Sequence, residues 1–96
     1  MKQYFADSHV TCRVEEPEGA LLYRPDIDSL QIINMTGLMI WEAVQTPHTL
    51  DEILEELLTR GLDVSRDVLE KDVMVFIDEM IRSGHVRVSG DEVNNG

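Results

Sequence analysis

Hydrophobic and polar residues alternate in the first third of the chain. The segment HVTCRVEE (residues 9–16) has apolar residues at every second position, which is the period of a strand. Two short apolar segments follow, ALLYR (residues 20–24) and SLQII (residues 29–33). EPEG and PDID separate the three segments and have the composition of turns. The pattern predicts three consecutive strands with hairpin-length connections.

The spacing of apolar residues becomes helical after Asn34. The side chain of Asn34 is a favourable N-cap, and the helix that it begins should end before Pro47. Thr49 followed by Glu52 is a capping box, so a second helix is expected to start there and to end at Gly61. Their predicted buried residues are Leu38, Ile40, Trp41 and Val44 in the first helix and Leu50, Ile53, Leu54, Leu57 and Leu58 in the second.

A third helix is predicted from about Arg66 to Ser83. Ser65 or Asp67 would cap its start, and Gly84 lies where a left-handed residue would end it. The segment HVRVS, which follows Gly84, is compatible with a final strand. The buried face of this helix should comprise Leu69, Val73, Phe76, Ile77 and Met80, with Ile81 at the margin.

The third helix carries more apolar residues than one buried face needs. Val68 and Val75 fall on a flank that also holds Asp72, Glu79 and Arg82. The two valines either pack against the strands or line one wall of a groove, and the sequence leaves both interpretations open. If there is a groove, its other wall would be the segment SLQII, as an edge strand that offers unpaired backbone groups to an extended peptide.

The chain has 96 residues, which predicts one domain. We expect a flexible N-terminal arm at residues 1–8, the folded domain at residues 9–89 and a flexible C-terminal tail at residues 90–96. The order of elements predicts an α+β fold that is winged helix-turn-helix-like, with a three-stranded antiparallel sheet followed by three helices.

Charge narrows the classes of partner. Lys and Arg total 8 against 19 Asp and Glu, for a formal net charge of −11. This balance opposes binding to nucleic acid or to an anionic membrane, because phosphate contacts need clustered cations. The N-terminus lacks the apolar core of a signal peptide, and no apolar stretch is long enough to span a bilayer. We therefore expect a cytoplasmic protein.

The sequence offers little for catalysis or for metal binding. Cys12 is the only cysteine, and the three histidines (His9, His48 and His85) are far apart in the sequence. Metal ligands usually show closer spacing, so we expect no metal site and no cofactor. The acidic residues Asp51, Glu52, Glu55 and Glu56 have the spacing of a solvated helix face near its N-terminus. We expect no catalytic residues.

Three segments resemble a known family. They are LLYRPDIDSLQIINMTGLMIWEAV, HTLDEILEELLTR and DVLEKDVMVFIDEMIRSGHV, within residues 21–88. Together they resemble the PqqD-like family of peptide chaperones, also called RiPP recognition elements, in the order of strands, the Asn before the first helix and the Thr before the second. The chain differs from the family pattern in having QTPHT before the second helix and GHVRV after the third.

The resemblance implies a function as well as a fold. Such domains bind the leader of a ribosomally made precursor peptide as an added strand between the third strand and the third helix, and they present it to a modifying enzyme, often a radical SAM enzyme. Carried over position by position, the implied peptide-binding residues are Leu30, Gln31, Ile32, Ile33, Val68, Asp72, Val75, Glu79 and Arg82.

Two other classes compete with a peptide chaperone. A winged helix-turn-helix fold suggests a DNA-binding regulator, but the third helix carries three cationic against five acidic residues between Arg66 and Arg82. The other competitor is a structural domain that forms a homodimer through the same open strand edge. An enzyme is the least supported class, because no constellation of residues points to one.

Overall fold

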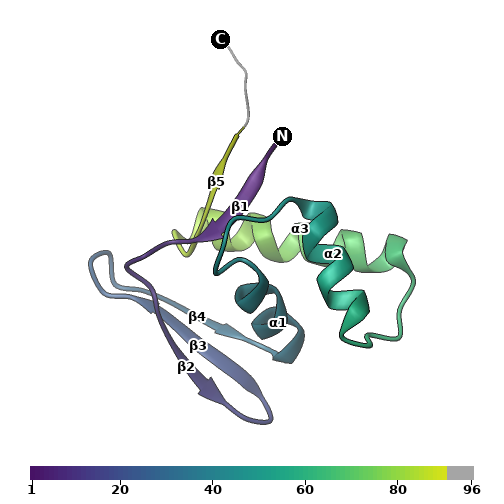
Figure 1. Ribbon diagram of the computed structural model, residues 1–96. Helices are drawn as coiled ribbons and strands as arrows, with labels where there is room; N and C mark the ends of the chain where they lie inside the picture. The colour runs from purple at the N-terminus through teal and green to yellow at the C-terminus, as the bar shows by residue number, and fades with distance from the viewer. Residues whose placement is uncertain (91–96) are drawn as a thin grey trace.

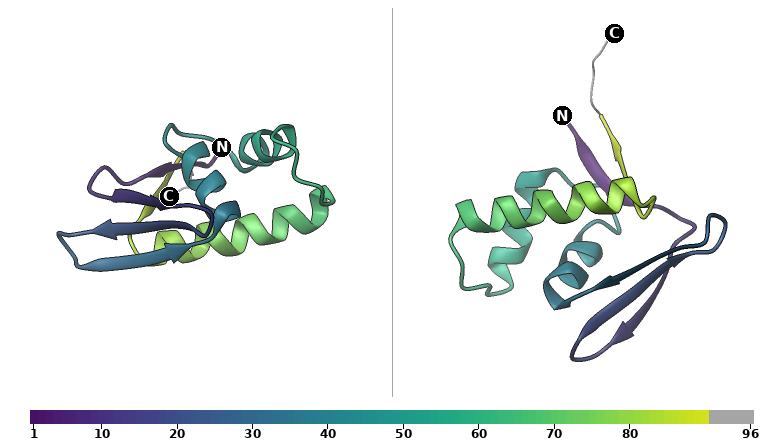
Figure 2. Two further views of the ribbon diagram at one scale, coloured as in Figure 1. Left: turned by 90° about the horizontal axis from the view of Figure 1, so that it is seen from below. Right: turned by 180° about the vertical axis from the view of Figure 1, so that it is seen from behind.

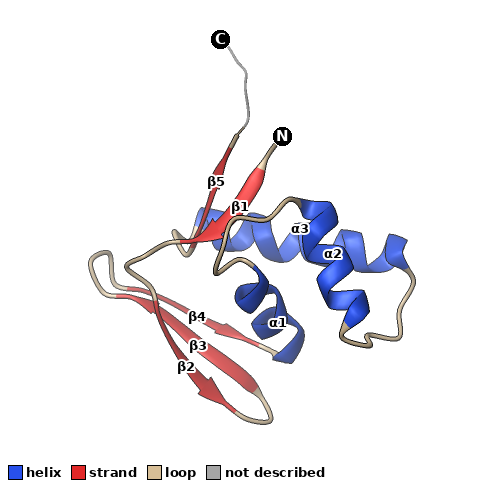
Figure 3. Cartoon of the chain, viewed as in Figure 1, coloured by secondary structure: helices blue, strands red, loops and turns tan. Residues whose placement is uncertain are grey.

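The computed structural model describes residues 1–90 and contains an antiparallel sheet followed by three helices (Figures 1 and 3). The described elements are β1 (Gln3–Ala6), β2 (Thr11–Glu15), β3 (Gly19–Arg24), β4 (Ser29–Ile33), α1 (Met35–Ala43), α2 (Leu50–Thr59), α3 (Arg66–Arg82) and β5 (Val86–Ser89). Strands β2, β3 and β4 form the three-stranded sheet in that order. The predicted α+β fold is confirmed, including the final strand.

Only part of the sheet faces the core. Helix α1 packs against β3 and β4, and on this face Ala20, Leu22 and Ile33 are buried. Leu22 lies opposite Cys12 of β2, yet Cys12 is exposed, and Val14 is 48% exposed. The alternation in residues 9–16 therefore predicted a strand correctly, but only Val10 of its apolar face packs against the core, and none of the described helices buries Cys12 or Val14.

Side-chain caps fix where each helix begins, as the sequence predicts. The side chain of Asn34 accepts from the Gly37 N–H, and Thr49 forms a full capping box with Glu52. Ser65, one of the two candidates, caps α3. At its other end Gly84 has φ +88°, the left-handed conformation that favours glycine.

The core joins all three helices to the sheet and to β5. Its buried hydrophobic residues are Tyr4, Ala20, Leu22, Ile33, Leu38, Ile40, Trp41, Ala43, Val44, Ile53, Leu54, Leu57, Leu69, Val73, Ile77, Met80 and Val86. Phe76, Leu50 and Leu58 are only partly buried against this cluster.

The prediction of a flexible arm at residues 1–8 is wrong. Residues Gln3–Ala6 form β1, which pairs antiparallel with β5, and the two strands lie side by side in both views (Figures 1 and 2). Tyr4 is buried, and its N–H donates to the carbonyl of His48 at 2.8 Å. The partners of β1 lie at least 38 residues away in the sequence, from Val44 and His48 to β5, so no local pattern indicates this strand. Residues 91–96 of the predicted tail lie outside the described part of the chain.

The Asp7 carboxylate connects the start of the chain to two later strands. Its side chain is 1% exposed, and its Oδ2 lies 3.3 Å from Arg24 Nη1 and 3.7 Å from Arg87 Nη1. Burial alone would raise the pKa of this carboxyl, but hydrogen bonds from His9 and the charge of Arg24 outweigh burial and lower the pKa. The ionised form of Asp7 therefore stabilises the junction of β1, β3 and β5.

We expect Asp7→Asn to lower the free energy of unfolding by about 2 kcal/mol at pH 7, because two arginines lose a buried partner. A lowered pKa in the folded state means that ionised Asp7 adds stability above the unfolded-state pKa of about 4, and that this stability is lost as the pH falls through the folded-state pKa. The difference between wild type and variant should therefore shrink below about pH 4. Urea denaturation over a pH series measures it.

The control is Asp26→Asn, which removes an exposed partner that also contacts Arg24 at 3.0 Å. This variant should change stability much less, because exposed ion pairs are weak. Equal losses for Asp7→Asn and Asp26→Asn would contradict a special role for the buried carboxylate.

Candidate functional site

Strand β4 is an edge of the three-stranded sheet. It pairs with β3 on one side, and within the described residues no strand occupies its other side. That open side faces helix α3, because residues of both elements line one hollow, and Figure 2 (right) shows β4 starting near the C-terminal end of α3 and diverging from the helix toward α1. The unpaired backbone groups of an edge strand are a template on which an extended chain can add.

A continuous groove follows this open edge. It consists of three adjoining hollows, and Glu79 lines all three. The strand side is residues 31–34, and α1 contributes Thr36, Gly37 and Ile40. The facing side is formed by Asp72, Val75, Phe76, Glu79, Met80, Arg82 and Ser83. We call this feature the β4–α3 groove.

Seven of the nine predicted site residues line the groove. They are Gln31, Ile32, Ile33, Asp72, Val75, Glu79 and Arg82. Leu30 and Val68 do not contribute to any of the three hollows. Whether these residues bind a peptide stays a prediction, but most of them lie where a peptide in the groove would meet them.

The side chains of β4 divide between two faces of the sheet. Gln31 and Ile33 lie on the face that α1 covers, and Ile33 is buried. Leu30 and Ile32 lie opposite Tyr23 and Leu21 on the other face and are 55% and 75% exposed. The side chains of Leu30 and Ile32 therefore both belong to the uncovered face of the sheet, and of the two only Ile32 also lines the groove, at the strand edge.

The structure excludes one of the two interpretations for both Val68 and Val75, and it places only Val75 in the groove. They are 53% and 63% exposed, so packing of these valines against the strands is wrong. Val75 lines the groove together with Asp72 and Glu79, which lie one turn before and one turn after it. Val68 lies one turn further toward the start of α3, beyond the hollows.

Sequence reasoning missed the floor of the groove. Phe76, assigned to the core, is only partly buried and forms the floor with Gly37 and Ile40. A Cβ atom at Gly37 would lie 2.8 Å from the Phe76 ring and 3.1 Å from Ile33 Cβ, so only glycine allows this close approach. A glycine in the first turn of an apolar helix is the signal that could have indicated it.

A buried histidine joins the two walls at one end. His85 is fully buried, and its Nε2 donates to the carbonyl of Ser29 at 2.9 Å. Its Nδ1 lies 2.7 Å from Ser83 Oγ, and Ser29 Oγ donates to the Ser83 carbonyl at 2.9 Å. We call these three residues the Ser29–Ser83–His85 clasp. It holds the start of β4 against the end of α3, while the groove opens toward Asn34.

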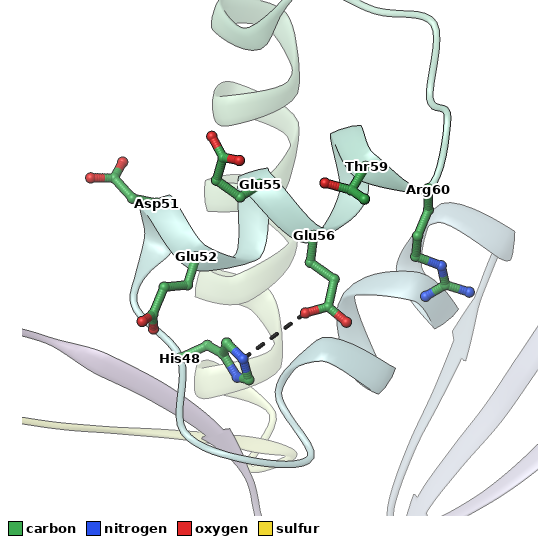
Figure 4. A pocket seen from close by; sticks show the side chains of 7 residues that line it. All are labelled: His48, Asp51, Glu52, Glu55, Glu56, Thr59 and Arg60. Atoms are coloured by element: carbon green, nitrogen blue, oxygen red, sulfur yellow. Dashed lines mark ion pairs between the residues drawn. The ribbon is translucent and has the colours of Figure 1, made fainter.

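A separate hollow on α2 is lined by carboxylates (Figure 4). Asp51, Glu52, Glu55 and Glu56 are exposed, as predicted for a solvated helix face. Several are already engaged, since Arg66 contacts Asp51 and Glu55, and Glu52 accepts from the Thr49 N–H. Within residues 1–90, no three His, Cys, Asp or Glu side chains are grouped to hold a metal ion. The described helices are also too short or too polar to cross a membrane.

Comparison with known proteins identifies the family. The model of the family described as "Coenzyme PQQ synthesis protein D (PqqD)" matches residues 20–86, which is more than half of the chain. The chain belongs to the PqqD family. The resemblance inferred from the three sequence segments is thereby confirmed. No curated protein matches the chain at a significant level.

A solved structure has the same fold as this PqqD family member. It is described as "Lasso peptide synthetase B1 complexed with the leader peptide" and matches with a TM-score of 0.72. The match covers 88% of this chain and 96% of that chain, at 15% sequence identity. At this identity the similarity establishes the fold alone.

Because the Ser29–Ser83–His85 clasp holds β4 against α3, a substitution in the clasp should destabilise this end of the β4–α3 groove. We expect His85→Ala to lower the free energy of unfolding by about 2–3 kcal/mol, because the Ser29 carbonyl loses its donor and a cavity forms. Hydrogen exchange of the amides at residues 29–31 should accelerate more than exchange in α1. Uniform acceleration across the molecule would contradict a local role for the clasp.

Proposed function

We propose that this chain is a non-catalytic peptide chaperone. In this proposal it binds the leader of a ribosomally synthesised precursor peptide in the β4–α3 groove. It then presents that peptide to a modifying enzyme, a radical SAM enzyme or another peptide-modifying enzyme. The observation that carries the proposal is the open edge of β4 facing a groove on α3 whose floor is apolar.

The comparisons support the same function. The chain belongs to the PqqD family, and the solved structure that shares its fold is described as a complex with a leader peptide. The acidic surface of α3 gives no support to DNA binding, since Asp72, Asp78 and Glu79 are all exposed on it.

Strand addition explains how such a site would work. The peptide backbone would hydrogen-bond to the free edge of β4, which gives affinity with little dependence on sequence. Every second side chain of the peptide would then point into the groove over Phe76 and Val75, which gives selectivity. The domain would do no chemistry itself, and it would raise the effective concentration of the peptide at the enzyme.

The first test is an NMR titration with a leader peptide taken from a small open reading frame beside this gene. The backbone amides of residues 30–33 should shift, because the peptide would pair with their strand. Strand β2 forms the other edge of the same sheet, so the amides of residues 11–15 are an internal control and should not shift. Shifts confined to β2 would overturn the proposal.

Isothermal titration calorimetry tests whether helix α3 contributes to leader-peptide binding. Val75→Arg should weaken leader binding by about tenfold or more, because it places a charged side chain in the apolar part of the groove; tenfold corresponds to about 1.4 kcal/mol. Val88→Arg is the matched control, since Val88 is an exposed valine on β5 outside the groove. Equal effects of the two substitutions would contradict binding at the groove.

Self-association through β4 is the competing use of the edge. Sedimentation at several protein concentrations, with and without the leader peptide, separates the two uses. A monomer that binds the peptide supports the chaperone. A dimer that excludes the peptide supports the structural alternative.

A further inference from the structure

The β4–α3 groove is not uniform in its chemistry. Toward Asn34 its floor is apolar, formed by Gly37, Ile40 and Phe76, and Val75 forms its wall. Two carboxylates, Asp72 and Glu79, lie at the rim of this same hollow. Arg82 lines the opposite end, beside Gln31 and Ser83. An occupant of the groove therefore meets an apolar surface beside Asp72 at one end, Glu79 along the whole groove and Arg82 at the other end.

The two rim carboxylates are available to a partner. Both are exposed, and the structure gives neither an ion pair nor a hydrogen bond to another described side chain. The carboxylates on α2 differ, because Asp51 and Glu55 both contact Arg66. The charge of Asp72 and Glu79 is therefore not neutralised within the fold, although they border an apolar surface.

The spacing of these groups matches an extended chain. Asp72 and Glu79 are seven residues apart, which corresponds to about 10 Å along a helix. A strand covers this distance in about three residues. A single peptide strand could therefore place an apolar side chain over Val75 and a cationic side chain near either carboxylate, within a segment of about four residues.

We propose that the groove selects a leader peptide with a Lys or Arg within three residues of an apolar side chain, through Asp72 and Glu79. This inference rests on the proposed function, because it assumes that the groove binds an extended peptide. It adds the substrate class: the recognised segment is apolar and basic. Its net charge is opposite to that of the chain, which is −11.

A displayed library of random twelve-residue peptides tests the proposal without knowledge of the natural leader. The full chain is the bait, and selected peptides are sequenced. We expect sequences with Lys or Arg within three residues of Ile, Leu, Val or Phe to be enriched over the starting library. Their affinity should fall several-fold between low and high salt, because exposed charges are screened.

Two double variants of α3 test whether Asp72 and Glu79 cause the preference for basic peptides. The double variant Asp72→Asn with Glu79→Gln should bind the selected basic peptides about five- to tenfold more weakly and lose most of the salt dependence. The matched control is Glu70→Gln with Asp78→Asn, which removes the same number of charges from exposed positions of α3 that do not line the groove. This control should bind like the wild type.

The outcomes separate the inference from the proposed function. If the selected peptides lack basic residues, or if they bind both double variants with equal affinity, the proposed charge preference is wrong. Either result would still be consistent with the proposed peptide chaperone. Failure of the wild-type chain to enrich any peptide would count against the groove as a peptide site altogether. Enrichment of basic peptides that bind more weakly only to the Asp72 and Glu79 double variant would support both the charge preference and the proposed function.

Discussion

The candidate site depends on one constraint: a sheet edge must stay unpaired while a helix is held beside it. The Ser29–Ser83–His85 clasp supplies this constraint at the start of β4, where a fully buried imidazole donates to the Ser29 carbonyl at 2.9 Å. Burial of a polar ring is tolerated because both of its nitrogens have hydrogen-bond partners. From this fixed end, β4 and α3 diverge toward Asn34 and leave a groove between them instead of a closed contact.

One face of helix α3 packs in the core, and a neighbouring flank of the same helix lines the groove. Leu69, Val73 and Ile77 bury one face completely, while Val75 and Glu79 on the neighbouring flank stay exposed. Phe76 lies between these two sets and is only partly buried. The same ring is therefore both the edge of the core and the floor of the groove, and the absent side chain of Gly37 allows it to pack closely there.

The two sheets have different roles: the β2–β3–β4 sheet provides the open edge, and the β1–β5 pair joins the two ends of the chain. Strands β1 and β5 pair although they lie near opposite ends of the sequence. The buried side chain of Asp7, directly after β1, forms an ion pair with Arg24 at the end of β3. Arg24 also donates to the carbonyl of Gly84 at 2.9 Å, directly before His85. The ion-pair cluster and the clasp are thus neighbours. The position of β4 relative to α3 depends on contacts from both ends of the chain.

The sequence by itself determined the local elements and the family. Helix starts at Asn34 and Thr49 follow from side-chain caps, and strand and helix periods depend only on neighbouring residues. Most groove residues were also found, because a surplus apolar flank on a helix is visible in its periodicity. Tertiary structure decided the rest. It paired β1 with β5, left β2 uncovered, turned Leu30 to the outer face of the sheet and brought Gly37 beneath Phe76. These features depend on contacts between residues far apart in the chain, and no local pattern encodes which surfaces meet.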